Sequence, residues 1–344
     1  MNLDSQEEIT QLDKSNVLGS VQNFSNQVIH AFEEASRVTV PEDYKNISNV
    51  VMCGMGGSGL AGRVIESLYP NLFLPLVRIN DYNLPGFVNE KSLVICSSYS
   101  GNTEETLENA NQAIAKNAKW MAIAAGGKLL DLAREHNVPY YQILPTHNPS
   151  NQPRMAIGYS VVGQLVLASK TGILHIDRSD IDQIVEAMKM IDENEAKQIA
   201  QKLFDRVILF ISSEHLVGAT HVSNNQLNEN AKNMSFDFQI PELNHHLMEG
   251  LRNPSDNKED LAVLLINSSL YGERIKKRFA ITKEVFEKNG IPTQEFNLKS
   301  TSKLAQVFEF IQFGAYLAFY VSVLNGLDSA PIPWVDYFKE QLAK

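Results

Sequence analysis

Val50-Val51-Met52-Cys53-Gly54-Met55-Gly56-Gly57-Ser58-Gly59 is the stretch of this chain that decides its fold class. It is typical of a buried strand followed by a loop of small residues, and a helical pattern with an apolar face begins directly after it. The arrangement recurs at 93–96, where the loop that follows reads Ser97-Ser98-Tyr99-Ser100-Gly101-Asn102-Thr103. Free N–H groups and the positive dipole end of a helix meet at each loop, so both loops are predicted to bind an anion, with phosphate the best fit.

The second loop adds three closely spaced hydroxyl groups, those of Ser98, Ser100 and Thr103. Hydroxyls are neutral donors that can surround a phosphate monoester without a metal ion. The hydroxyl of Ser58 lies at the tip of the first loop. The two loops together therefore predict a metal-free phosphate site.

The glycine loop also has a competing interpretation. Gly54, Gly56 and Gly59 match the G-x-G-x-x-G pattern of dinucleotide sites, and Asp81 follows about 20 residues later, as that pattern expects. However, a dinucleotide site needs no hydroxyl cluster after the neighbouring strand, and no hydride-transfer constellation is evident. Nucleotide binding and plain tight turns remain as alternatives to phosphate binding.

Length and composition limit the classes of function. The chain has 344 residues, which suits two domains of about 150 residues each. Its net charge is −10 and it has no polybasic run, so neither nucleic acid nor an anionic membrane surface is expected as a partner. A hydrophobic fraction of 44% and a charged fraction of 20% are typical of a globular protein.

Cysteine usage and the N-terminal residues predict a cytoplasmic protein. The two cysteines, Cys53 and Cys96, both lie in apolar runs and are expected to be buried reduced thiols. The first residues lack the basic and apolar regions of a signal peptide. The apolar stretch 304–327 is interrupted by Gln306, Glu309 and Gln312, so it is expected to be a helix buried in the core or at a subunit contact rather than a membrane span.

Short apolar runs alternate with amphipathic helices along most of the chain, which predicts the α/β class with parallel sheets covered on both faces. The expected strands of the first half are 50–53, 76–79, 93–96, 120–124 and 140–144. The second half resembles a degenerate copy, with apolar runs at 206–213 and 261–269. We divide the chain into an N-terminal helical arm (1–45), a first subdomain with the phosphate loops (46–175) and a second subdomain with C-terminal helices (176–344).

Three further motifs restrict the class of protein to which the chain can belong. They are Gln152-Pro153-Arg154, Asn228-Glu229-Asn230-Ala231-Lys232 and Pro241-Glu242-Leu243-Asn244-His245-His246. With the two loops, they make the chain resemble the bifunctional phosphoglucose/phosphomannose isomerases, which are built from sugar isomerase (SIS) domains. The resemblance implies two SIS subdomains and a homodimer with the active site between the subdomains, near the subunit interface. It also implies isomerisation of a phosphorylated hexose with neither a metal nor another cofactor.

The resemblance assigns a role to each candidate residue. The substrate phosphate would be bound by Gly56, Gly57, Ser58, Ser98, Ser100 and Thr103. Arg154 would face the reacting carbons and Glu229 would be the base, while His245 and Lys339 would open and close the sugar ring. Composition alone would make Glu229 a solvated charge and Lys339 a surface lysine, so these two roles depend on the resemblance.

The chemistry needs few groups. One carboxylate can move a proton between C1 and C2 through a cis-enediol, so Glu229 suffices as base and then acid. Mannose 6-phosphate differs from glucose 6-phosphate only at C2, which is planar in the enediol. The family often has a small hydroxyl residue near a turn that reads Asp328-Ser329-Ala330-Pro331 here, and Ser329 could substitute for it.

Some alternatives stay open at this point. His245-His246 could be a metal pair, although adjacent residues rarely point the same way and no Cys or His cluster completes a site. His246 could take the role given to His245. The chain could isomerise another sugar phosphate, or act as a non-catalytic sugar-phosphate sensor, although the N-terminal arm is too short and too little basic for a DNA-binding module.

Overall fold

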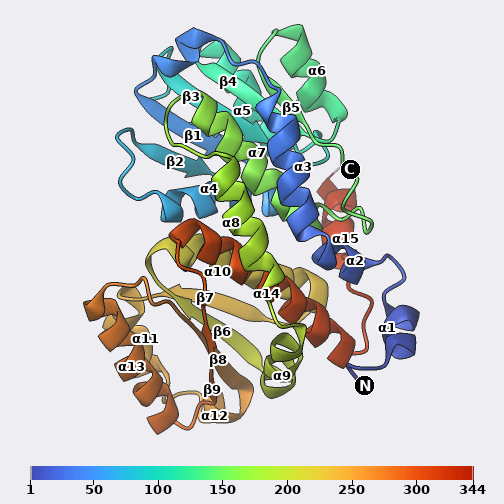
Figure 1. Cartoon of the computed structure of the whole chain (residues 1–344), viewed down its shortest axis with the longest axis vertical. Helices are drawn as coiled ribbons and strands as arrows, with labels where there is room; N and C mark the ends of the chain where they lie inside the picture. Colours follow the sequence, from blue (N-terminus) through green and yellow to red (C-terminus); the bar gives the residue numbers. More distant parts are fainter. Residues whose placement is uncertain (1, 343) are drawn as a thin grey trace.

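The computed structural model describes residues 2–342 and residue 344, and it confirms the α/β class with two parallel sheets (Figure 1). The first sheet has the order β2-β1-β3-β4-β5. Its strands are β1 (Asn49–Cys53), β2 (Leu76–Ile79), β3 (Ser92–Ser97), β4 (Lys119–Ala124) and β5 (Tyr140–Gln142). Every residue of β1 and β3 is buried, because helices cover both faces of these central strands.

The register of the first sheet places the two anion loops next to each other. Cys53 at the end of β1 pairs with Cys96 of β3, so the loops that follow leave the same edge of the sheet. Both thiols are buried and unpaired. This edge, at the carboxyl ends of parallel strands, is where ligands bind in open α/β sheets.

The second sheet has the order β7-β6-β8-β9. Its strands are β6 (Val207–Ser212), β7 (Ser235–Gln239), β8 (Leu261–Asn267) and β9 (Thr293–Asn297). The apolar runs in the sequence predict the two central strands, β6 and β8, but not β7 or β9. These two lie at the sheet edges and are only partly buried, so they carry polar residues and lack a continuous apolar run.

Helices flank both sheets. In the arm and first subdomain they are α1 (Gln6–Leu12), α2 (Val17–Gln22), α3 (Phe24–Ser36), α4 (Gly56–Leu68), α5 (Glu104–Ala115), α6 (Gly127–Glu135) and α7 (Ile157–Lys170). The helices that follow are α8 (Arg178–Lys189), α9 (Glu193–Leu203), α10 (Val217–Gln226), α11 (Leu247–Gly250), α12 (Asn257–Asp260), α13 (Glu273–Lys288), α14 (Lys303–Leu324) and α15 (Pro333–Leu342). The polar stretch 178–203 therefore forms two helices, α8 and α9. The division of the chain at 175–176 stays a prediction.

The N-terminal arm packs onto helices on both sides of the division at 175–176. Helix α3 contacts α7 and α8. The buried Gln27 side-chain amide donates to the carbonyl oxygens of His147, at 3.0 Å, and Met155, at 2.8 Å. Because Met155 directly follows Arg154, the arm supports the segment that carries this candidate catalytic residue.

Helix α14 is the central helix of the molecule and packs against α8, α9 and α10 (Figure 1). It is long and apolar enough to cross a membrane, yet 89% of its most apolar window is buried inside the protein. This confirms the expectation of a core helix for the stretch after 304. The helix also presents polar groups to neighbouring loops: Glu309 accepts the backbone N–H groups of Lys299, at 2.8 Å, and Ser300, at 2.9 Å.

Candidate active site

The first anion loop is closed tightly enough to require glycine. Gly56 begins α4 with a φ of +50°. A Cβ on Gly59 would lie 2.4 Å from the carbonyl oxygen of Gly54, closer than any side chain allows. A Cβ on Gly57 would lie 3.2 Å from the Cα of Arg154, so the loop abuts the backbone of the candidate catalytic arginine.

The two loops are hydrogen-bonded to each other. The hydroxyl of Ser58 accepts the backbone N–H of Tyr99 at 2.8 Å. Within the second loop, the hydroxyls of Ser98 and Thr103 are 2.8 Å apart, and Ser98 also accepts the backbone N–H of Gly101 at 3.1 Å. Ser100 is exposed at the rim. Three of the six predicted phosphate residues thus lie in the first turn of α4, and the other three lie in the adjoining loop that leads to α5.

Arg154 is 2% exposed, and its guanidinium is held by hydrogen bonds from several directions. It lies in the 3-10 helix η2 (Pro153–Met155). Its Nη2 donates to the carbonyl oxygens of Ser329, at 2.8 Å, and Ala330, at 2.7 Å. Its Nε donates to Oδ1 of Asn230 at 2.5 Å, and its Nη1 donates to Oε1 of Gln152 at 2.9 Å. The cation is therefore fixed before any substrate arrives.

Glu229 lies in a single π-helical turn, η4 (Leu227–Ala231), that continues α10. Its Oε2 is 3.8 Å from Nε of Arg154, and 31% of its side chain is exposed. Burial raises the pKa of the Glu229 carboxyl, while the charges of Arg154, Lys339 and Lys232 oppose that rise. Burial also lowers the pKa of Arg154. A raised pKa makes a carboxylate more basic, as proton abstraction requires.

Lys232 is a residue of this site to which the sequence analysis gave no role. It ends the π turn with a φ of 50°. The residue is exposed, but its ammonium group donates to the carbonyl oxygens of Asn230, Asp328 and Ser329 at 2.9 to 3.1 Å. Partial burial, together with the charge of Arg154, lowers the pKa of Lys232 to about 8. Lys232 and Arg154 thus share the carbonyl of Ser329 and hold the same turn.

The two remaining candidates, Lys339 and His245, differ in their position relative to Glu229. Lys339 lies on the exposed helix α15, and its charge acts on the Glu229 carboxyl. His245 ends the 3-10 helix η5 (Glu242–His245), is exposed, and makes no hydrogen bond to Arg154 or Glu229. Helix α11, which begins two residues later, lies across the second subdomain from α15 (Figure 1). Within one chain, His245 is therefore not assembled with the other candidates.

Ser329 is buried and contributes its carbonyl to the site. Its hydroxyl is 2.5 Å from the hydroxyl of Ser322 on α14. Elsewhere, the described residues offer one group that could hold a metal ion, His175, Asp177 and Asp180. Asp177 and Asp180 form the capping box at the start of α8, which already accounts for their positions.

Comparison of the chain with known proteins identifies its family. A family model described as the bacterial phospho-glucose isomerase C-terminal SIS domain matches residues 192–342. The chain is 31% identical to the bifunctional phosphoglucose/phosphomannose isomerase of Caldicellulosiruptor bescii, over 94% of this chain and 98% of that protein. It is 29% identical to the enzyme of the same name from Aquifex aeolicus, over 89% of this chain and 93% of that protein.

Solved structures agree on the fold. The crystal structure of tagatose-6-phosphate ketose/aldose isomerase from Escherichia coli matches with a TM-score of 0.65 at 16% identity, covering 95% of this chain and 96% of that one. At this identity, the likeness concerns the fold alone. The identity to the two curated relatives extends over nearly the whole of each sequence, and the chain therefore belongs to the family of bifunctional phosphoglucose/phosphomannose isomerases.

Proposed function

We propose that this protein interconverts glucose 6-phosphate and mannose 6-phosphate with fructose 6-phosphate through a cis-enediol intermediate. The observation that carries the proposal is the pairing of Glu229 with the buried Arg154, 3.8 Å apart, next to a phosphate loop that touches the Arg154 backbone. A carboxylate, a fixed cation and a phosphate site are the parts that this isomerisation needs. Two cysteines that are buried and unpaired support a cytoplasmic location.

Each group has a defined task in the reaction. The loops hold the substrate phosphate, and Glu229 removes the proton from C2 of the open-chain aldose, then returns it at C1. Arg154 stabilises the negative charge that develops on the enediolate oxygens. Because its guanidinium is already held by the carbonyls of Ser329 and Ala330, little reorganisation is needed when the charge appears.

The same groups serve both aldoses. Glucose and mannose 6-phosphates give one enediol, in which C2 is planar. Return of the proton to either face of C2, after rotation about the C2–C3 bond, yields one epimer or the other. Dual specificity therefore requires room for this rotation and no additional catalytic residue.

The direct test is NMR of the purified protein with fructose 6-phosphate in D₂O. We expect glucose 6-phosphate and mannose 6-phosphate to appear with deuterium at C2. Equal rates with and without EDTA would support proton transfer by side chains alone. Phosphosugar binding without conversion would contradict the proposal and indicate a sensor or an isomerase of another sugar.

We propose that the protein acts as a homodimer with its active site near the interface. Two observations support this. His245 lies away from Arg154 and Glu229 within one chain, so it can assist ring opening only from another subunit. Helix α15 beside the site also exposes large apolar side chains, with Trp334 81% and Phe338 63% exposed. Such a surface is typical of a protein–protein contact.

Complementation between subunits tests the arrangement. We expect His245→Asn and Glu229→Gln to be nearly inactive alone with glucose 6-phosphate. A mixed dimer pairs one intact Glu229 with one intact His245, so an equal mixture formed by co-expression should recover about a quarter of wild-type activity. Isolated mixed dimers that remain inactive would contradict a site shared between subunits.

Substitution in the second loop tests the phosphate assignment. Ser100→Ala combined with Thr103→Ala removes two hydroxyl donors, and each lost hydrogen bond to a charged group costs about 1.5–3 kcal/mol. We expect KM for fructose 6-phosphate to rise at least about tenfold with little change in kcat. Ser67→Ala, a hydroxyl at the far end of α4, is the matched control. An unchanged KM in the double variant would place the phosphate elsewhere.

Lys232 predicts an alkaline limit to activity. With a pKa of about 8, its ammonium loses a proton as the pH rises past 8, and both its charge beside Glu229 and a donor to the Ser329 turn are lost. We expect kcat to fall above pH 8 in the wild type. Lys232→Arg, which stays charged, should retain its activity to pH 9.5. A fall of equal size and midpoint in both proteins would assign the limit to another group.

A further inference from the structure

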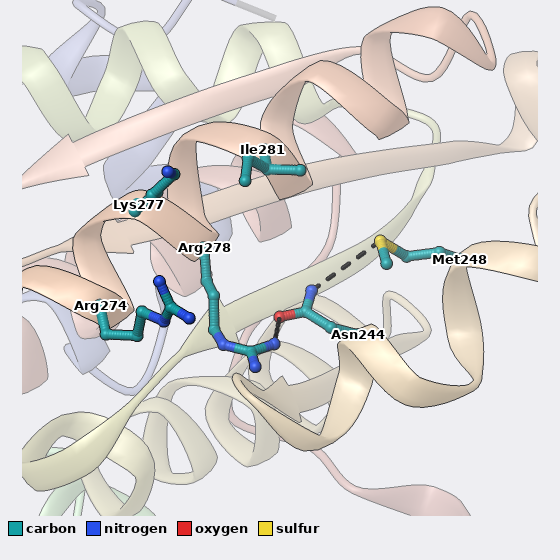
Figure 2. Close-up of a pocket in the computed structure, with 6 residues that line it drawn as sticks. All are labelled: Asn244, Met248, Arg274, Lys277, Arg278 and Ile281. Carbon is teal, nitrogen blue, oxygen red and sulfur yellow. Dashed lines mark hydrogen bonds between the residues drawn. The ribbon is translucent and has the colours of Figure 1, made fainter.

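A groove lies apart from the Arg154–Glu229 pair, between α13 and the segment formed by η5 and α11 (Figure 2). It encloses about 360 Å³, within the range of small-molecule sites. Its lining residues are Asn244, Met248, Arg274, Lys277, Arg278 and Ile281. None of them belongs to the phosphate loops or to the Arg154–Glu229 site.

The groove gathers positive charge that has no carboxylate partner. Arg274, Lys277 and Arg278 are spaced three and four residues apart, so they share a face of α13. Among the residues that the structure describes, no carboxylate oxygen lies within 4.0 Å of their cationic nitrogens. Like charges at this spacing destabilise a helix by a few tenths of a kcal/mol. Without a bound anion, this arrangement of cations therefore lowers the stability of α13.

The other lysines of α13 form ion pairs with glutamates. Lys276 pairs with Glu273 at 3.0 Å, Lys288 pairs with Glu284 at 2.5 Å, and Lys283 pairs with Glu295. Unpaired positive charge on α13 is thus confined to the groove. This is the pattern expected where an external anion supplies the missing negative charge.

One of the cations is held in place. Nη1 of Arg278 donates to Oδ1 of Asn244 at 3.1 Å, and Nδ2 of Asn244 donates to Oγ1 of the buried Thr282 at 2.8 Å. Figure 2 shows Arg278 reaching from α13 to Asn244, with Arg274 extending from the same helix. Met248 and Ile281 add apolar surface to the walls. A positioned guanidinium is suited to bidentate binding of phosphate oxygens.

We propose that this groove is a binding site for a small molecule carrying two or more phosphate charges. Three cations and no lining carboxylate call for a multiply charged anion. A volume of about 360 Å³ suits a small ligand. A nucleic acid is disfavoured because the chain carries a net charge of −10 and the unpaired cations occupy one short helix face. The groove is separate from the phosphate loops, and Asn244 in its wall directly precedes the candidate residue His245.

The test uses inorganic pyrophosphate as the probe and isothermal titration calorimetry of the full-length protein at 0.15 M salt. Ser100→Ala with Thr103→Ala serves as the background, so that the loop site contributes little. In this background, Arg274→Gln with Arg278→Gln should weaken binding at least about tenfold. Lys276→Gln with Lys288→Gln, which removes the same charge from α13 outside the groove, should change binding less than about twofold. Thermal unfolding checks that each variant is folded.

Three outcomes would overturn the proposal. An equal loss of pyrophosphate affinity in the two double variants would show that binding depends only on the net charge of the protein. Unchanged pyrophosphate binding in Arg274→Gln with Arg278→Gln would show that the groove does not bind the anion. A change of oligomeric state in that variant alone, measured by light scattering, would show that a second copy of the chain covers this face.

Discussion

Glu229→Gln lowers kcat with fructose 6-phosphate by at least about a hundredfold and leaves KM nearly unchanged, because general acid–base groups contribute about 10²–10⁴-fold to a rate. Glutamine keeps the size of the side chain and its hydrogen-bonding capacity but cannot accept the proton from C2. Steady-state kinetics give both constants. Glu249→Gln, which removes an exposed carboxylate on α11, is the matched control and should behave as the wild type.

The pH profile adds a second criterion to this prediction. Glu229 must be ionised to act as a base, and burial raises its pKa above that of an ordinary carboxyl group. Activity should therefore fall as the pH drops through that raised value, at a higher pH than an exposed glutamate would give. Since the charge of Arg154 opposes the rise, its removal should move the acid limb upward. A glutamine variant with near-normal turnover would exclude Glu229 as the base.

Arg154→Lys should lower kcat/KM by about 10²–10³-fold, the range measured when one preorganised donor to a developing oxyanion is removed. Lysine keeps the charge, but its single ammonium cannot reproduce the planar fork that bonds Asn230, Ser329 and Ala330 together. Most of the loss should appear in kcat, because the phosphate loops remain intact.

The same substitution tests the structural part of the assignment. Buried carbonyls that lose their donor cost about 1–3 kcal/mol each, so Arg154→Lys should also lower the free energy of unfolding. The carbonyl of Ala330 loses its arginine donor, whereas that of Ser329 keeps Lys232. Arg178→Lys, an exposed arginine in an ion pair on α8, is the matched control. A variant with wild-type kcat/KM would remove Arg154 from the reaction.

The sequence predicted those parts of the fold that local pattern determines. The central strands are continuous apolar runs, and each phosphate loop is a contiguous motif, so both could be found without tertiary information. The edge strands β7 and β9 could not, because polar residues such as Asp237 and Glu295 interrupt their apolar pattern. Family resemblance, and not local pattern, selected Arg154 and Glu229.

The contacts around the site depend on parts of the chain far apart in sequence. Lys232 reaches carbonyls almost a hundred residues away, at Asp328 and Ser329, and no spacing rule predicts such a contact. The same holds for Gln27 of the arm, which supports Met155 beside the candidate catalytic arginine. The separation of His245 from the other candidates is also a property of the folded chain, and it gives the dimer proposal its physical basis.

The π-helical turn makes the position of the candidate base depend on the number of residues in the backbone. Glu229 and Asn230 are consecutive, yet both reach the guanidinium of Arg154, which the wider turn permits and an ordinary α-helical turn would oppose. Loss of one residue between 227 and 231 would restore regular winding and rotate the carboxylate away, while the helix and the glutamate both survived. Among relatives of this protein, an alignment gap in this turn would therefore mark a lost isomerase more surely than a substitution on the surrounding surface.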